Sequence, residues 1–207
     1  MRHRRRRLTT RGRILDAALA LLEQRRWNEI SLGEIMGSAG LTRTAFYRHF
    51  EDRDALLVAL LEHIGVHLEQ VPAAWQRGSG DPVAELRAAV SALVAVYARH
   101  GRLFGALAEA ANHDAQVRAL YLGLADRLIA AVSERITADV AAGRSRISDA
   151  EEVARALIWM NERYLDTQFG RDERGDPERA SRALSEVWVG ALYGAEAIPD
   201  DSPSGAA

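Results

Sequence analysis

A short polar run between residues 42 and 53 has the residue types and spacing that suit contact with DNA. If this run begins as a helix, its outer side carries Arg43, Thr44, Tyr47 and Arg48. An arginine in the first turn of such a helix is placed to reach a base edge, and arginine with guanine is the commonest specific contact. Tyr47, His49 and Arg53 suit phosphates, which fix the register of a protein on DNA without reading its sequence.

Three short helices must hold this polar face in place. The first is predicted over residues 10–25. The second begins at the capping box from Ser31 to Glu34 and runs to about residue 38. Gly40 supplies the turn, and Thr42 caps a third helix that runs through residue 49. Ser31 and the amides beside it offer another phosphate site. The small core that fixes the helices would consist of Leu32, Ile35, Met36, Leu41, Phe46 and Phe50.

This arrangement has two readings when spacing alone is considered. The third helix could lie in a major groove about 12 Å wide while its neighbours brace it. The same pattern also fits a generic three-helix core with a solvated polar face, because short helix pairs are common. The arginine arm Arg2–Arg7 likewise suits either a minor groove and flanking phosphates, or a disordered start that only aids solubility.

Charge is distributed unevenly along the 207 residues, whose net charge is −2. Residues 1–53 hold 12 arginines against six acidic residues, whereas residues 54–207 hold 15 against 23. A basic head on an acidic body is expected of a protein that presents one end to phosphates.

Several classes of site and protein are excluded or disfavoured. The absence of cysteine excludes disulfides, thiolate zinc sites and a cysteine nucleophile. His63 and His67 are four residues apart, but no third ligand is evident, so we expect neither a metal nor a cofactor. No nucleophile motif is present, and we expect no enzymatic activity. No apolar run approaches the ~20 residues that span a bilayer, and no signal peptide is visible, so we expect a cytoplasmic protein with no membrane partner.

The remainder of the chain also shows helical periodicity, so the fold class is all-α with about nine helices. Further helices are predicted over residues 52–76, 82–99, 102–111, 114–142, 149–169 and 177–193. In the helix over 149–169, Asn161 lies in the middle of an apolar stripe. A buried amide must be paired by backbone, water or a ligand, because leaving it unpaired costs roughly 1–3 kcal/mol.

The segment from Ile35 to Leu57 closely resembles the signature of TetR-family regulators, and the likeness covers about residues 10–60. It implies an all-α homodimer whose recognition helices enter successive major grooves of a palindromic operator. In that family, positions that match Arg43, Thr44, Tyr47, His49 and Arg53 commonly contact DNA. One departure is that the first helix ends in Arg25-Arg26-Trp27-Asn28, without the usual glycine.

Two later segments, Trp159–Arg163 and Glu186–Gly194, resemble the C-terminal domain of the EthR-type branch of this family. The likeness implies an elongated apolar pocket in which an asparagine at the position of Asn161 bonds the ligand. A second asparagine of that branch is replaced here by Ile158, so polar anchoring is thinner. Besides Asn161, candidate pocket walls are Leu93, Tyr97, Phe104, Leu107, Tyr121, Leu124, Leu128 and Trp188, each of which also reads as ordinary core.

A dimer interface is predicted on the last two helices. Trp159 falls on the charged face of its helix, near Arg163, where a large aromatic suits a helix–helix contact. Gly190 and Gly194 are small enough to let two backbones approach closely. Two helices from each subunit would form a four-helix interface, which also matches the family.

The sequence therefore predicts a ligand-responsive repressor with double-stranded DNA, a second copy of itself and a hydrophobic small molecule as partners. Residues 1–9 are expected to form a disordered basic arm, residues 10–53 a helix-turn-helix domain, residues 54–196 a larger ligand-binding and dimerisation domain, and residues 197–207 a disordered tail. The alternatives are a helical DNA-binding regulator without an effector, and a helical enzyme that uses the apolar pocket.

Overall fold

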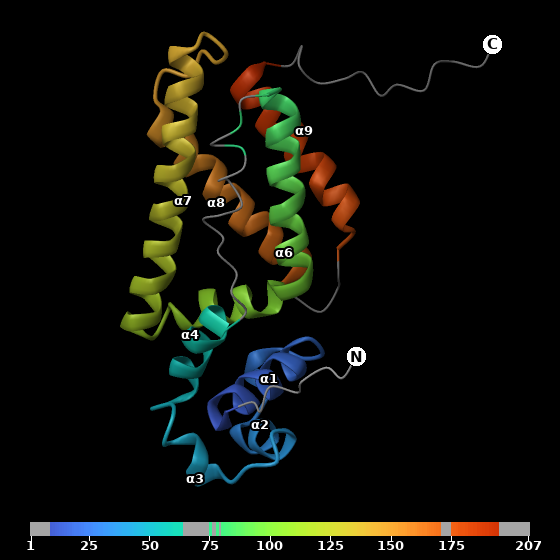
Figure 1. Cartoon of the computed structure of the whole chain (residues 1–207), viewed down its shortest axis with the longest axis vertical. Coiled ribbons are helices and arrows are strands. Elements are labelled where there is room, and N and C mark those ends of the chain that lie inside the picture. The colour runs from blue at the N-terminus through green and yellow to red at the C-terminus, as the bar shows by residue number, and fades with distance from the viewer. Residues whose placement is uncertain (1–8, 64–74, 76–77, 79, 171–174, 195–207) are drawn as a thin grey trace, which may run out of the picture. The chain divides into compact units, whose positions relative to one another are not determined.

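A computed structural model describes residues 9–63, 75, 78, 80–170 and 175–194, and these residues contain helices and turns but no strand (Figure 1). The all-α prediction is confirmed. Two compact units are present. The first unit comprises Met1–Val66, Val96–Gly123 and Leu165–Arg174, and the second unit comprises His67–Ala95, Leu124–Tyr164 and Gly175–Ala207. Among the described helices, none has the length and apolar character that crossing a bilayer requires.

The N-terminal part of the first unit is a set of short helices around one apolar core. Its elements in chain order are α1 (Thr10–Leu22), the 3₁₀ turn η1 (Trp27–Glu29), α2 (Leu32–Ser38), α3 (Arg43–Phe46) and α4 (Arg53–His63). Helix α1 packs against α2 and α4, and α2 packs against α3. Of the six predicted core residues, five are buried, and Leu41 is half-buried.

Local hydrogen bonds explain where α2 begins and ends. The Ser31 hydroxyl accepts from the Glu34 amide at 3.2 Å, and the Glu34 carboxylate accepts from the Ser31 amide at 2.7 Å, so the predicted capping box is confirmed. Gly40 has a φ of 63°, which confirms its predicted left-handed turn. The Arg13 guanidinium donates to the Ala39 carbonyl at 2.5 Å and so ties α1 to the end of α2.

Four longer helices follow: α6 (Pro82–Ala110), α7 (Ala115–Ala141), α8 (Ala150–Phe169) and α9 (Pro177–Tyr193). The prediction of two separate helices over 82–99 and 102–111 is wrong, because α6 is continuous. Gly101 suggested a break, but it serves close packing. A Cβ on Gly101 would lie 2.6 Å from the Phe169 carbonyl oxygen, so only glycine lets α6 approach the end of α8 this closely.

Two other predicted boundaries differ from the structure, and a third falls outside the described residues. The first helix ends at Leu22, and η1 follows it where the family's usual glycine is missing. The third helix ends at Phe46, and residues 47–49 form a turn; the Thr42 side chain makes no capping hydrogen bond. The helix predicted over 52–76 is described only from Arg53 to His63. The arm Arg2–Arg7, His67 and the tail 197–207 lie outside the described residues.

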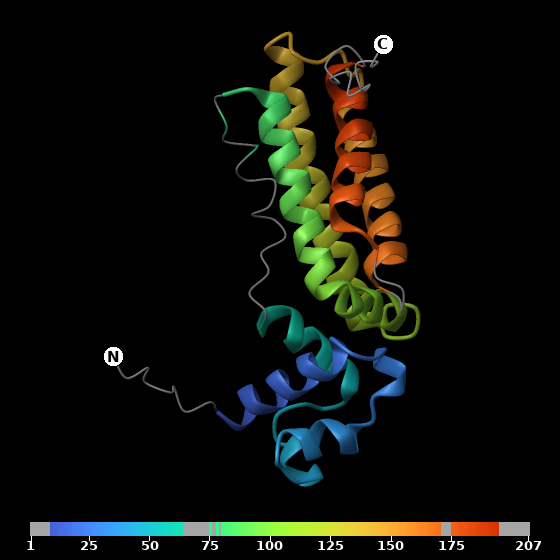
Figure 2. The ribbon, with the colours of Figure 1, turned by 90° about the vertical axis from the view of Figure 1, so that its right-hand side faces the viewer.

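In the second unit, the parts of α6, α7, α8 and α9 that belong to it run side by side as a helix bundle in both views (Figures 1 and 2). Their inward faces are apolar at helical spacing. The buried residues include Leu86, Val90, Ile129, Val132, Ile136, Leu157, Leu184 and Val189. Asp176 begins α9 by accepting from the Glu178 amide at 2.9 Å, with Pro177 in the first turn as predicted.

Candidate functional site

The polar face of α3 is presented by a firmly held scaffold. Phe46, on the inner side of α3, is fully buried and packs against Phe50 with ring centroids 5.3 Å apart. Outward, Tyr47 is 60% exposed, and Arg43 is exposed as well. The buried aromatic pair therefore anchors a short helix whose opposite side is free to meet a macromolecular surface.

The predicted DNA-contacting residues lie at the start of α2, in and around α3, and at the start of α4. All but one of them are exposed: Ser31, Thr42, Arg43, Thr44, Tyr47 and His49. Arg53 is half-buried. Its Nη2 donates to the Trp27 carbonyl at 2.5 Å, and its guanidinium lies 4.6 Å from the centre of the Trp27 ring. Arg53 thus braces η1 against α4, and its phosphate contact remains a prediction.

Ser31 has a structural role of its own at the start of α2. The Glu34 carboxylate in the same turn accepts from the Arg25 guanidinium at 2.6 Å. The hydrogen bonds from Arg25 and Ser31 lower the pKa of Glu34 to about 2, so this carboxylate is ionised at neutral pH. An ionised carboxylate opposes an anion at the same helix end. Phosphate contact by Ser31 remains a prediction, and it competes with this charge.

The second unit contains a small apolar cavity beside Asn161. The side chain of Asn161 is buried, and its Oδ1 accepts from the Trp188 indole N–H at 2.9 Å. The amide that the sequence left without an assigned partner is therefore paired by a side chain of α9. The cavity has a volume of about 50 Å³, and its lining is mostly apolar: Trp75, Leu86, Ala89, Val90, Leu93, Leu128, Val132, Ile158, Asn161 and Trp188.

Four of the predicted pocket residues line this cavity: Leu93, Leu128, Asn161 and Trp188. Leu124 belongs to the second unit but is not in its lining. The other four predicted wall residues, Tyr97, Phe104, Leu107 and Tyr121, belong to the first unit. Tyr97 stacks there on Phe104 with ring centroids 4.6 Å apart. Their part in ligand binding remains a prediction.

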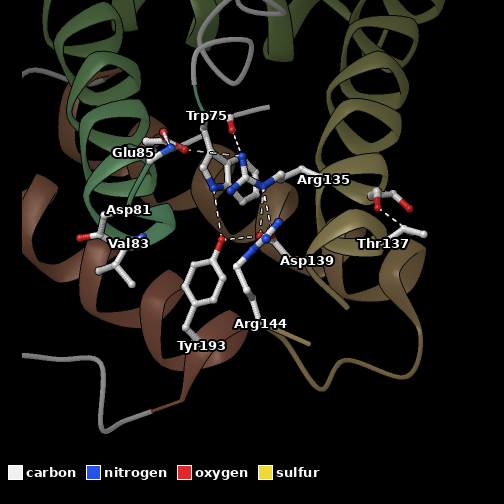
Figure 3. Close-up of polar contacts among 11 residues, drawn as sticks. Trp75, Asp81, Val83, Glu85, Arg135, Thr137, Asp139, Arg144 and Tyr193 are labelled. Carbon is white, nitrogen blue, oxygen red and sulfur yellow. Dashed lines mark hydrogen bonds and ion pairs between the residues drawn. The ribbon is translucent and has the colours of Figure 1, made fainter. Parts of the chain in front are cut away.

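Sequence reasoning missed most of the remaining cavity wall and a polar cluster next to it. The cluster consists of Glu85, Arg135, Asp139, Arg144 and Tyr193, with Trp75 at its centre (Figure 3). The Asp139 carboxylate, 1% exposed, accepts from Tyr193 at 2.6 Å, Arg135 at 3.0 Å and Arg144 at 2.7 Å. A usable signal existed, because Arg135 and Asp139 interrupt the apolar stripe of α7 that contains Val132 and Ile136.

Burial and hydrogen bonding act in opposite directions on the pKa of Asp139, whereas burial and the hydrogen bond to Asp139 act in the same direction on that of Tyr193. Burial alone would raise the pKa of Asp139, but hydrogen bonds from Tyr193, Arg144 and Arg135 outweigh it and hold that pKa below its ordinary value. Burial and the bond to Asp139 raise the pKa of Tyr193. The cluster therefore holds an ionised aspartate and a neutral tyrosine that donates its single proton to it.

The predicted interface residues on α8, on α9 and at its end are exposed or half-buried. Trp159 is half-buried, whereas Arg163 is exposed. Gly190 is half-buried, and Gly194 ends α9 with a φ of 89°. Val187, 46% exposed, lies one turn before Gly190 and was not predicted. Val187 therefore adds exposed apolar surface close to Gly190 on α9.

Comparison with known proteins covers nearly the whole chain. A family model described as "Bacterial regulatory proteins, tetR family" matches residues 14–60, and one described as "Transcriptional regulator EthR, C-terminal domain" matches residues 86–194. The chain is 27% identical over 184 residues to "HTH-type transcriptional regulator EthR" of Mycolicibacterium smegmatis, covering 87% of this chain and 85% of that protein. It is 28% identical over 185 residues to the protein of the same name from Mycobacterium tuberculosis, covering 87% and 86%.

Solved structures agree on the fold. The repressor SmeT of the Stenotrophomonas maltophilia multidrug efflux pump SmeDEF superposes with a TM-score of 0.67 at 22% identity, covering 94% of this chain and 95% of that one. A TetR-like transcriptional regulator from Rhodococcus sp. RHA1 superposes with a TM-score of 0.66 at 22% identity, covering 90% and 98%.

Proposed function

Because the chain belongs to the TetR family of transcriptional regulators, with an EthR-type C-terminal domain, we propose that it binds a palindromic operator as a homodimer and is released by an apolar small molecule. The observation that carries the DNA-binding half is the exposed polar face of α3 on a buried aromatic anchor. The observation that carries the sensing half is an apolar cavity with one buried amide at its wall.

On the DNA side, each residue has a role that suits its position. Arg43, at the start of α3, reads a base edge in the major groove. Tyr47 and His49, in the turn that follows, hold phosphates, and Thr42 and Thr44 flank the reading arginine with hydroxyl donors. Two copies of this face, held at a fixed distance by a dimer, would read two half-sites about 34–36 Å apart.

Selection of bound sites from random DNA, followed by hydroxyl-radical footprinting, tests this geometry. We expect an inverted repeat, two protected stretches one helical turn apart, and two protein chains per site by native mass spectrometry. Protection of a single stretch, or one chain per site, would contradict the dimeric reading of a palindrome.

On the sensing side, the character of the cavity supports an apolar effector with at least one polar group. The walls contributed by α6, α7 and α9 are largely aliphatic or aromatic, and the Asn161 amide is the polar side chain among the described lining residues. Ligand pockets usually measure about 300–1,000 Å³. At about 50 Å³ the cavity must therefore widen to admit an effector, and this widening is the change that would be passed to the DNA-binding helices.

The small volume also favours a second candidate, a repressor whose cavity is a packing defect with no effector. A pair of matched substitutions on α6 separates the two. Ala89→Leu fills the cavity from its wall, whereas Ala92→Leu adds the same atoms to an exposed position of the same helix. Both variants should bind the selected operator as wild type does.

A small-molecule screen for operator release then provides the readout. If the cavity senses a ligand, compounds that release wild type and Ala92→Leu will fail to release Ala89→Leu. If no compound in a broad apolar library releases wild type, or if Ala89→Leu responds as wild type does, the sensing role of this cavity is rejected and the repressor without an effector is the better account.

The homodimer is proposed to form through the outer faces of α8 and α9. Trp159 and Val187 supply apolar area, and Gly190 and Gly194 allow close approach. Val187→Glu places a charge in that interface and should raise the dimer dissociation constant in analytical ultracentrifugation. The matched change Val140→Glu, on an exposed valine of α7, should leave the dimer intact. An unchanged dimer in Val187→Glu would place the interface elsewhere.

A further inference from the structure

Among the described residues that line the cavity, Trp75 is the one that lies outside α6, α7, α8 and α9. The other lining residues belong to α6, α7, α8 or α9, where a large displacement would disturb the bundle itself. Trp188, the other large aromatic of the lining, is in α9 and is tied to Asn161. Trp75 precedes α6, and its side chain is only 1% exposed. Of the two large aromatic side chains in the described lining, its indole is the one that does not belong to α6, α7, α8 or α9.

The groups around the indole form a site with a defined chemistry (Figure 3). The guanidinium of Arg135 lies 5.2 Å from the ring centre, an arrangement that favours an electron-rich aromatic ring. Trp188 meets the ring edge to face at 6.3 Å. The indole N–H donates to the Tyr193 hydroxyl oxygen at 3.3 Å. Two aromatic or cationic contacts and one polar contact thus surround a flat ring.

The polar contact selects a hydrogen-bond donor. Tyr193 has one hydroxyl proton, and it donates that proton to the Asp139 carboxylate at 2.6 Å. Asp139 is held in this position by Arg135 and Arg144. Because the proton is committed, the Tyr193 oxygen can only accept from whatever faces it on the cavity side. A group without a donor at this position would leave the buried oxygen unpaired and be disfavoured.

We infer that the space filled by the Trp75 indole is a binding site for planar aromatic compounds that carry an N–H donor on the ring edge, which replace Trp75 between Arg135, Trp188 and Tyr193. The site adjoins the cavity beside Asn161, because the Trp75 ring that fills the site lines this cavity and Trp188 borders both. The inference rests on the proposed sensing function for its biological use, and it names the chemistry of the effector: an aromatic N–H head on an otherwise apolar body.

Chemical rescue of a Trp75→Ala variant tests the site directly. The full-length variant is titrated with indole and with indene, which has the same shape but no N–H, by isothermal calorimetry. An apolar cavity of about 150 Å³ already accepts a ligand as large as benzene, so removal of the indole side chain leaves room for either compound. We expect indole to bind Trp75→Ala at least tenfold more tightly than it binds wild type, whose own indole occupies the site.

The donor requirement is read from a second substitution. In Trp75→Ala, indole should be preferred over indene by about 3- to 10-fold, the effect of one net hydrogen bond. In Trp75→Ala/Tyr193→Phe that preference should vanish, because the acceptor oxygen is gone. If Trp75→Ala binds the two compounds equally, or if the preference survives Tyr193→Phe, the assignment is overturned.

A third variant guards against loss of folding. Trp75→Phe puts a smaller ring in the site, which makes no hydrogen bond to Tyr193 and is therefore easier for indole to displace, so this variant should unfold cooperatively and still bind indole more tightly than wild type. No gain in indole affinity in a folded Trp75→Phe would also overturn the assignment. Release of the selected operator is recorded in parallel. Donor-selective binding without release would leave the site standing and reject the sensing function, whereas release by other compounds without donor-selective binding would reject the site alone.

Discussion

Removal of the Asp139 carboxylate should destabilise the protein more than almost any other polar substitution in the second unit. Asp139 and Arg135 are 1% and 5% exposed, and they face each other at 3.0 Å. In Asp139→Ala, the buried Arg135 charge would lose its carboxylate at 3.0 Å and keep, among the described residues, the Trp75 carbonyl, the Trp75 ring face and Glu85, whose Oε2 lies 3.6 Å away. Breaking a buried ion pair by removing one partner costs about 3–5 kcal/mol.

The matched control is the other arginine that contacts the same carboxylate. Arg144 is 46% exposed, so Arg144→Ala should cost at most about 1 kcal/mol in the free energy of unfolding. Asp139→Asn keeps an acceptor but loses the charge, and it should fall between the two. Urea unfolding followed by far-UV circular dichroism, at one fixed protein concentration because a dimer is expected, gives all three values. If the unfolding free energies of Asp139→Ala and Arg144→Ala differ by less than about 1 kcal/mol, the buried Arg135–Asp139 pair does not stabilise the fold as its geometry indicates.

Three further predictions concern stability. The pKa of Asp139 is lowered in the folded protein, so ionised Asp139 contributes to the free energy of unfolding above its ordinary pKa of about 3.9, and this contribution is lost as the pH falls below that value. Wild type should therefore lose more unfolding free energy between pH 5 and 3 than Asp139→Asn does. Parallel pH profiles for the two proteins would disprove this. Gly40→Ala should lower the free energy of unfolding by about 1–2 kcal/mol, because the φ of 63° at this position disfavours a side chain, and thermal unfolding measures the loss. No change in stability would mean that the turn rearranges freely. Trp188→Phe leaves the buried Asn161 oxygen without its donor and should lower the free energy of unfolding by roughly 1–3 kcal/mol. The double variant Trp188→Phe/Asn161→Leu should recover part of that loss. A double variant no more stable than Trp188→Phe would count against the pairing.

Local signals in the sequence were the most reliable. The capping box at Ser31, the turn at Gly40 and the Asp176 cap each depend on residues within a few positions of one another, and each is present in the structure. Gly101 misled for a physical reason. A glycine within a helical pattern indicates either a break or a close approach, and only the position of Phe169, 68 residues away in sequence, decides between them.

The pairing within the polar cluster could not be predicted from local pattern, although the interrupted stripe of α7 indicates buried polar residues. Arg135 pairs with the Trp75 carbonyl across 60 residues, and Tyr193 with Asp139 across 54. The periodicity of α7 indicates that Asp139 is buried, but it does not say which chain segment supplies its donors. The same limit applied to the cavity wall, where Asn161 and Trp188 were predicted separately and their mutual hydrogen bond was not.

The central claim, that the face of α3 reads an operator, is tested most directly by the operator affinity of Arg43→Ala against that of Arg99→Ala. Both residues are exposed arginines of the first unit, so the two variants lose the same charge. By fluorescence anisotropy on the selected site in 150 mM salt, Arg43→Ala should bind about 1–3 kcal/mol more weakly than wild type, the value of one bidentate base contact. Arg99→Ala should bind as wild type does. Equal affinities for wild type and Arg43→Ala, or equal losses in both variants, would contradict DNA reading by this helix.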